Sequence, residues 1–174
     1  RIDDVINERT GLVTDKGTDV FQSGLDALWD IYGGNKPAPE VIYQDVLRYV
    51  FNSDSTSDEP RLRVEAIKQV QGEIAMRIGD GEYFGVINIG DTAKLIKQCD
   101  ENGIVARDEE FSKESLFRSI NKKDSNIKIL IGSRKFTEGW NSWRVSTMGL
   151  INFARSEGSQ AIQLFGRGVR LKGY

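Results

Sequence analysis

The stretch Ile127-Lys128-Ile129-Leu130-Ile131-Gly132-Ser133 gives the clearest indication of the fold class of this chain. Its isoleucine-rich run ends at a glycine and a serine, which predicts a buried β-strand followed by a polar turn. A second turn is expected at Gly139-Trp140-Asn141, and the apolar run at residues 145–151 predicts another buried strand. Ligands of open α/β sheets bind at the carboxyl ends of the strands. Ser133, Gly139 and Asn141 are therefore expected near a ligand-binding edge.

A pair of arginines follows in Gln163-Leu164-Phe165-Gly166-Arg167-Gly168-Val169-Arg170, at the end of a helix expected over residues 160–169. Arg167 and Arg170 are three residues apart, so both project from one helix face. A guanidinium group presents a planar fork of donors that matches phosphate oxygens. The pair therefore predicts a clamp for the phosphates of a nucleotide. The alternative is a solvated helix end, where arginine complements the helix dipole.

The middle of the chain alternates between strand and helix patterns. Strands are expected at residues 84–89 and 104–105, a helix from Asp91 or Thr92 to residue 102, and a helix from Ser112 to residue 121. Together with the later strands, this alternation predicts an α/β fold with a mainly parallel sheet that helices cover on both faces.

The first part of the chain has mostly helical spacing of its apolar residues. Helices are expected at residues 20–32 and 40–51, a polar loop at 52–60, and a long amphipathic helix at 61–78. Residues 1–60 are interpreted as a helical linker or insertion, and residues 61–174 as the α/β domain.

Residues 127–170 resemble motifs V and VI of superfamily 2 helicases and translocases, with the closest likeness to DEAD/DEAH-like type III restriction subunits. Ser133, then Gly139-Trp140-Asn141, then Gln163 to Arg170 follow in the order found in that family. Residues 83–91 with the helix after them resemble motif IV. The resemblance implies a RecA-like C-terminal helicase lobe.

The resemblance also implies roles for individual residues. Arg167 and Arg170 would be arginine fingers that reach the γ-phosphate, with Gln163 beside them to order the nucleotide. Gly139 and Asn141 would face ATP, although Asn141 stands where many family members have aspartate.

The same resemblance implies that Ser133 and Arg134 approach the nucleic-acid backbone. Simpler roles stay open for several of these residues. Ser133 could only cap a turn, and Gly139 could only supply a positive φ. Trp140 and Trp143 are interpreted as packing residues rather than base-stacking platforms.

A phosphate-binding loop of the form Gly-x-x-x-x-Gly-Lys-Ser/Thr does not occur in the sequence, and neither does an Asp-Glu-x-His string. ATP and Mg²⁺ would therefore be held mainly by an N-terminal RecA-like lobe of the same parent protein. The chain starts at Arg1 and stops soon after Arg170, so we expect a piece of a larger protein whose lobe continues past residue 174. Alone it is not expected to hydrolyse ATP at a useful rate.

Composition excludes several other classes of function. The sequence has no histidine and only Cys99, which excludes histidine-dependent triads, histidine metal sites and intrachain disulfides. Cys99 is interpreted as a packing residue rather than a nucleophile. The sequence has no apolar run of about 18 residues, so no membrane span is predicted. A lone cysteine fits a cytoplasmic location.

Charge is distributed unevenly along the chain. The whole chain has a net charge of −2, whereas residues 127–174 carry eight basic and two acidic residues. Phosphate contacts need local rather than global positive charge. We therefore predict a motor lobe of an ATP-dependent helicase or translocase, acting on DNA rather than RNA, in a restriction-modification system. The alternative is a DNA-docking or protein-interaction module that derives from such a lobe and has no catalytic role.

Overall fold

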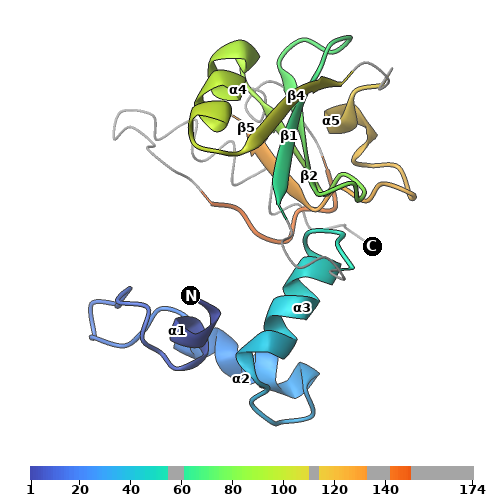
Figure 1. Ribbon diagram of the computed structural model, residues 1–174. Coiled ribbons are helices and arrows are strands. Elements are labelled where there is room, and N and C mark those ends of the chain that lie inside the picture. The colour runs from blue at the N-terminus through green and yellow to red at the C-terminus, as the bar shows by residue number, and fades with distance from the viewer. Residues whose placement is uncertain (55–60, 110–113, 133–141, 150–174) are drawn as a thin grey trace. The chain divides into compact units, whose positions relative to one another are not determined.

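The computed structural model describes residues 1–54, 61–109, 114–132 and 142–149 (Figure 1). The chain divides into two compact units, Arg1–Thr56 and Ser57–Tyr174. Each unit is described by itself. The sequence-based boundary after residue 60 stays a prediction, because residues 55–60 lie outside the described ranges.

The N-terminal unit is helical. Its helices are α1 (Ile2–Ile6), α2 (Gln22–Ile31) and α3 (Pro39–Tyr49). The helices predicted at residues 20–32 and 40–51 are thus confirmed. Glycines at positive φ follow α2, and Pro39 occupies the first turn of α3, where its missing N–H costs nothing. The buried apolar side chains of this unit are few: Ile6, Leu25, Ile42 and Leu47.

Hydrogen bonds to two carboxylates, those of Asp45 and Asp19, fix the connections of the N-terminal unit. The hydroxyl of Tyr32 donates to Asp45 Oδ2 at 2.6 Å, which joins the end of α2 to α3. This hydrogen bond to Asp45 raises the pKa of Tyr32 to about 12. Asp19 accepts from the Thr10 hydroxyl at 2.6 Å and from the Phe21 amide at 3.0 Å. Accepting from the Thr10 hydroxyl and the Phe21 amide lowers the pKa of Asp19.

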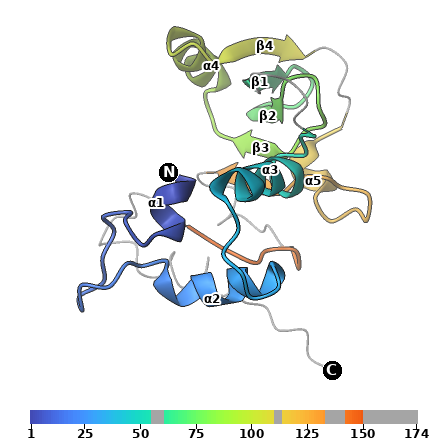
Figure 2. The ribbon, with the colours of Figure 1, turned by 60° about the horizontal axis from the view of Figure 1, so that its bottom comes forward.

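The second unit is built on a five-stranded sheet in the order β4-β1-β2-β3-β5. Figure 2 shows β4, β1, β2 and β3 in sequence from top to bottom. The bounds are β1 (Leu62–Ile67), β2 (Glu73–Ile78), β3 (Gly85–Asn88), β4 (Val105–Glu109) and β5 (Ile129–Gly132). The strands β1, β3, β4 and β5 run in one direction, and β2 runs against them.

The predicted mainly parallel sheet is therefore only partly right. The α/β class is confirmed, but the described sheet is mixed, because β2 pairs antiparallel with both β1 and β3. The strand predicted at residues 145–151 is not found over its described part, since residues 145–149 have no regular secondary structure.

The long helix predicted at residues 61–78 is wrong. These residues form the β1–β2 hairpin, with Val64 opposite Met76 and Ala66 opposite Ile74. The apolar residues of this segment also alternate with period two, and Gly72 at a φ of +84° supplies the turn. Apolar spacing alone fits both an amphipathic helix and two alternating strands. The segment forms strands because it pairs within a buried sheet.

Helices cover the two faces of the sheet. The chain crosses from β3 to β4 through α4 (Thr92–Glu101) and returns from β4 to β5 through α5 (Leu116–Ser119). Crossovers between strands of one direction are right-handed, so two that run in opposite senses lie on opposite faces. Figure 1 shows α4 and α5 on the two sides of the sheet. We call these the α4 face and the α5 face.

The ends of α4 follow the sequence signals, whereas α5 spans only Leu116–Ser119 of the helix predicted from Ser112 to residue 121. Asp91 caps α4 by accepting from the Lys94 amide at 3.0 Å, and residue 102 ends the helix as predicted. Ser115 caps α5 by accepting from the Arg118 amide at 3.1 Å. The predicted cap Ser112 lies outside the described residues. The predicted strands at residues 84–89, 104–105 and 127–131 correspond to β3, β4 and β5.

The core on the α5 face combines apolar packing with a buried ion pair. Its apolar cluster consists of Val86, Phe117, Ile120 and Ile127. Nearby, the carboxylate of Glu65, with a residue exposure of 2%, accepts from Arg77 Nε at 2.9 Å and from the Tyr83 hydroxyl at 2.6 Å. The Arg77 guanidinium also lies 5.5 Å from the centre of the Tyr83 ring. Removing one partner of such a buried pair would leave an uncompensated polar group, so the stability of this part of the core depends on all three side chains.

Candidate functional site

The sequence-predicted site residues lie outside the described part of the chain. These are Ser133, Arg134, Gly139, Asn141, Gln163, Arg167 and Arg170. The structure therefore brings none of them together, and their roles stay predictions. It does describe β5, which ends just before Ser133, and residues 142–149, which follow Asn141. Ser133 comes directly after Gly132, the last residue of β5, which runs parallel to β3.

Three residues form a row across the carboxyl edge of the sheet, where β3 and β5 end. Asn88 is the last residue of β3 and pairs with Gly132 on one side and with Glu73 on the other. Because β2 is antiparallel, Glu73 at its start lies at the same edge as the ends of β3 and β5. Cross-strand partners place their Cβ atoms about 4.5–5.5 Å apart. The row therefore collects a carboxylate and an amide where the chain enters its predicted motif.

Glu73 is almost completely buried, with 1% of its surface exposed. Its Oε1 accepts from the Ser115 hydroxyl at 2.5 Å, and its Oε2 accepts from the Phe117 amide at 3.4 Å. Both donors belong to the start of α5, so the carboxylate ties the carboxyl edge of the sheet to that helix. A buried carboxylate without such donors would be strongly destabilising.

Asn88 has 4% of its surface exposed, and its side-chain Nδ2 is buried without a hydrogen-bond partner among the described residues. The surrounding backbone is closely packed. The Ile89 amide donates to the Gly72 carbonyl at 2.9 Å, and a Cβ at Gly72 would lie 2.6 Å from the Ile89 carbonyl oxygen. Gly72 is thus the residue that lets the β1–β2 turn approach the end of β3.

Arg144 fixes the chain after the predicted turn at Asn141. Its guanidinium donates to the carbonyl of Ile120, to that of Ser125 at 3.0 Å and to that of Ile127 at 3.3 Å. Ile127 precedes β5, so the chain that left the carboxyl edge at Gly132 is back at the amino edge by Arg144.

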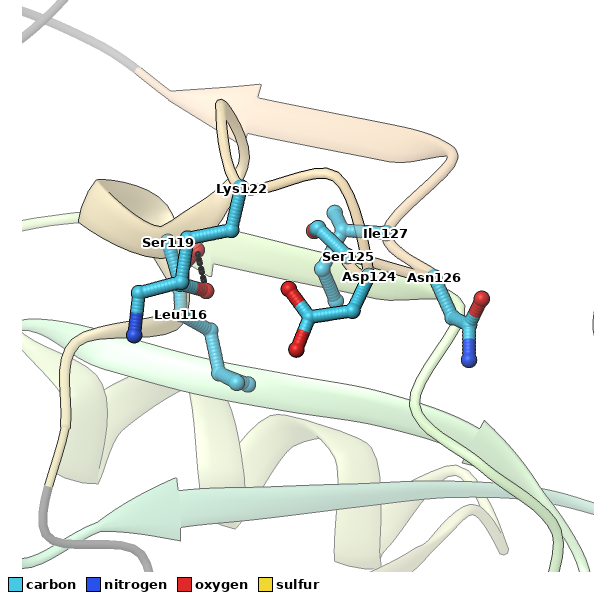
Figure 3. A pocket seen from close by; sticks show the side chains of 7 residues that line it. All are labelled: Leu116, Ser119, Lys122, Asp124, Ser125, Asn126 and Ile127. Carbon is cyan, nitrogen blue, oxygen red and sulfur yellow. Dashed lines mark hydrogen bonds between the residues drawn. The ribbon is translucent and has the colours of Figure 1, made fainter.

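A cavity of about 240 Å³ lies beside α5 (Figure 3). Its lining consists of Leu116, Ser119, Lys122, Asp124, Ser125, Asn126 and Ile127. Figure 3 shows the Asp124 carboxylate projecting into the space, while the Ser119 hydroxyl donates back to the Leu116 carbonyl. Lys122 is paired with Glu114 at 2.6 Å. The cavity therefore offers no concentration of one charge, and it does not contribute to the site.

Other reactive groups are sparse in the described residues. Burial raises the pKa of the Cys99 thiol, which lowers its thiolate fraction and agrees with a packing role rather than a nucleophilic one. Within the described ranges, no three acidic or cysteine side chains come close enough to hold a metal ion. None of the helices that the structure describes has the length and apolar character needed to span a membrane.

Comparisons with models of protein families, with curated proteins and with solved structures find no match to this chain. The helicase resemblance therefore rests on the motif residues and their order alone.

Sequence reasoning missed Glu73, Asn88 and Arg144. Asn88 had a usable signal, since it is the one polar residue of the run Val86-Ile87-Asn88-Ile89. A polar residue that ends a buried strand marks the ligand edge of an α/β sheet. Glu73 had no such signal, because its segment was assigned to a helix. Arg144 could not have been found, because its partners are backbone carbonyls.

Proposed function

We propose that this chain is the second motor lobe of an ATP-dependent helicase or translocase, with a RecA-like arrangement and a cytoplasmic location. Its nucleic acid is DNA, and its context is a restriction-modification system. The observation that carries the proposal is the position of β5. This strand lies parallel to β3 and ends at Gly132, immediately before the motif that begins at Ser133.

Two further features support the proposal. The crossovers through α4 and α5 cover opposite faces of the sheet, as in doubly wound nucleotide-binding folds. The chain is back at the amino edge of the sheet by Arg144, which donates to the Ile127 carbonyl before β5. The antiparallel β2 departs from a RecA-like sheet. In the proposal, the β1–β2 hairpin is an addition to the β3–α4–β4–α5–β5 part of the lobe.

In this function the chain supplies arginines and the other lobe holds the nucleotide. ATP and Mg²⁺ would be bound mainly by an N-terminal RecA-like lobe, and Mg²⁺ would neutralise charge on the phosphates. Arg167 and Arg170 would stabilise the charge that develops on the transferred phosphoryl group, with Gln163, Gly139 and Asn141 beside them. Ser133 and Arg134 would contact the DNA backbone. Closure of two lobes around ATP would move the strand.

ATP hydrolysis by the intact protein tests this proposal. Turnover should be low without nucleic acid and should rise at least tenfold when single-stranded or duplex DNA is added. Binding of DNA without any hydrolysis would instead identify a docking module that has lost its motor role.

A further inference from the structure

We propose that Asn88 is a binding residue of this lobe, whose side-chain amide donates a hydrogen bond to a neutral sugar or base oxygen of a bound nucleotide unit. This inference rests on the proposed function and gives a role to Asn88, which lies in the stretch that resembles motif IV but to which the resemblance assigns no role.

The first reason is the energetic state of Asn88. A buried donor without a partner costs free energy that a folded chain ordinarily avoids. Nδ2 of Asn88 is such a donor among the described residues, on a side chain that is 4% exposed. Unfavourable groups of this kind persist where function requires them.

The second reason is the position of Asn88 in the sheet. Asn88 ends β3 in register with Gly132, which ends β5. Ligands of doubly wound sheets gather at this edge. The other described buried side-chain atom without a partner is the Ser125 hydroxyl, which belongs to the segment before β5 at the opposite edge. Ser125 therefore provides a matched control.

The third reason concerns the chemistry of the ligand. Glu73 is the cross-strand partner of Asn88, and both of its carboxylate oxygens already accept from the start of α5. Its negative charge next to Asn88 disfavours a phosphate oxygen as the acceptor. A neutral oxygen on a sugar or a base does not suffer this repulsion. Because Nδ2 is covered in the free chain, the acceptor reaches it by displacing the atoms that cover it.

The experiment compares Asn88→Leu and Asn88→Ala with Ser125→Ala in the intact protein. Thermal unfolding gives the stability of each variant, and fluorescence titrations give its affinity for oligo-dT, for oligo-U and for ATP. If the Asn88 amide is retained for binding, removing it should raise the stability of the protein and lower its affinity for the ligand. Asn88→Leu should raise Tm by about 3–8 °C, because it removes the unpaired donor.

The same substitution should weaken binding about tenfold, the loss expected for one hydrogen bond in a ligand site. Asn88→Ala should show the same loss of binding, which preserves the test if the leucine variant does not fold. Ser125→Ala should leave every affinity unchanged. If the Asn88 variants lose affinity for oligo-U alone, the acceptor is a ribose 2′-hydroxyl. If they lose affinity for both polymers, it is a sugar or base atom that the polymers share. If they lose affinity for ATP alone, the acceptor belongs to the nucleotide.

Unchanged affinity of both Asn88 variants for all three ligands would overturn the inference while leaving the proposed function intact. A fall in Tm on Asn88→Leu without loss of binding would show that Asn88 is a structural residue. A wild-type protein that binds neither polymer nor ATP would remove the proposed function and this inference together.

Discussion

Ser115 and Glu73 are joined by a hydrogen bond of 2.5 Å between the serine hydroxyl and Glu73 Oε1, although 42 residues separate them in the sequence. Ser115 at the same time caps α5 through the Arg118 amide. One hydroxyl thus secures both the helix start and the buried carboxylate at the carboxyl edge of the sheet.

Replacing Ser115 should therefore cost more than an ordinary helix cap. Ser115→Ala removes the cap and one of the two donors to a carboxylate that is 1% exposed. The two losses together should lower the free energy of unfolding by about 2–4 kcal/mol, measured by urea denaturation. Ser119→Ala is the control, since its hydroxyl only donates to the Leu116 carbonyl of its own helix. Equal effects of the two substitutions would show that Glu73 does not depend on Ser115.

Arg144→Met tests whether Arg144 holds in place the segment that follows the predicted ATP-facing turn at Gly139-Trp140-Asn141. The substitution removes the donors to the Ile120, Ser125 and Ile127 carbonyls. The free energy of unfolding should fall by about 1–3 kcal/mol. Amide exchange should also become faster at residues 120–127, as hydrogen-exchange mass spectrometry would detect.

Arg118→Met is the matched control for Arg144. It removes an arginine from α5 whose side chain has no hydrogen bond or ion pair in the described ranges. An Arg144→Met protein that exchanges no faster than the Arg118→Met protein would contradict the anchoring role.

Gly72 is the glycine for which the structure gives the strongest steric reason. Alanine there would combine a φ of +84° with a Cβ only 2.6 Å from the Ile89 carbonyl oxygen. Gly72→Ala should cost about 3 kcal/mol or more. Gly103, at a φ of +74° in open space, carries only the backbone strain and should cost about 1–2 kcal/mol. Urea denaturation measures both losses of unfolding free energy. Equal losses for Gly72→Ala and Gly103→Ala would show that the β1–β2 turn does not approach β3 this closely.

Tyr32 makes the N-terminal unit sensitive to alkaline pH. The pKa of Tyr32 is raised to about 12 by its hydrogen bond to Asp45. The folded state holds the phenolic proton more tightly than an unfolded chain, where tyrosine titrates near about 10. The stabilisation is thus fully present below about pH 10 and is lost as the pH rises through about 12.

Tyr32→Phe should lower stability at neutral pH and should flatten this alkaline loss in a series of thermal unfolding curves. Tyr43→Phe, which removes an exposed phenol, should leave the pH dependence unchanged. An alkaline loss of the same size in the wild type and in Tyr32→Phe would disprove the coupling.

How far the sequence predicted the structure depended on whether apolar spacing was ambiguous. β5, β3 and α4 were predictable because short isoleucine-rich runs and the Asp91 cap each allow one interpretation. The β1–β2 hairpin was not, because its apolar residues fit both a helical face and two alternating strands. Its pairing with β3 and β4 is a long-range contact that no local pattern encodes.

The candidate site was predicted only in its motifs. The order of Ser133, Gly139, Asn141 and the arginine pair could be read from the sequence, whereas their supports could not. Glu73 and Asn88 become neighbours only when β2 pairs with β3. Arg144 recognises carbonyl oxygens, which every residue possesses and no sequence pattern marks.

In the proposed function, the arginine pair acts on ATP that another lobe holds. The most direct measurement is DNA-stimulated ATP hydrolysis by the intact protein carrying Arg167→Ala, with Arg155→Ala as a matched control outside the motif. An arginine finger contributes about 10³–10⁵ in turnover. Arg167→Ala should therefore lose at least a thousandfold in turnover while it binds ATP as tightly as the wild type, and Arg155→Ala should keep its turnover. Unchanged turnover in Arg167→Ala would show that Arg167 is not an arginine finger.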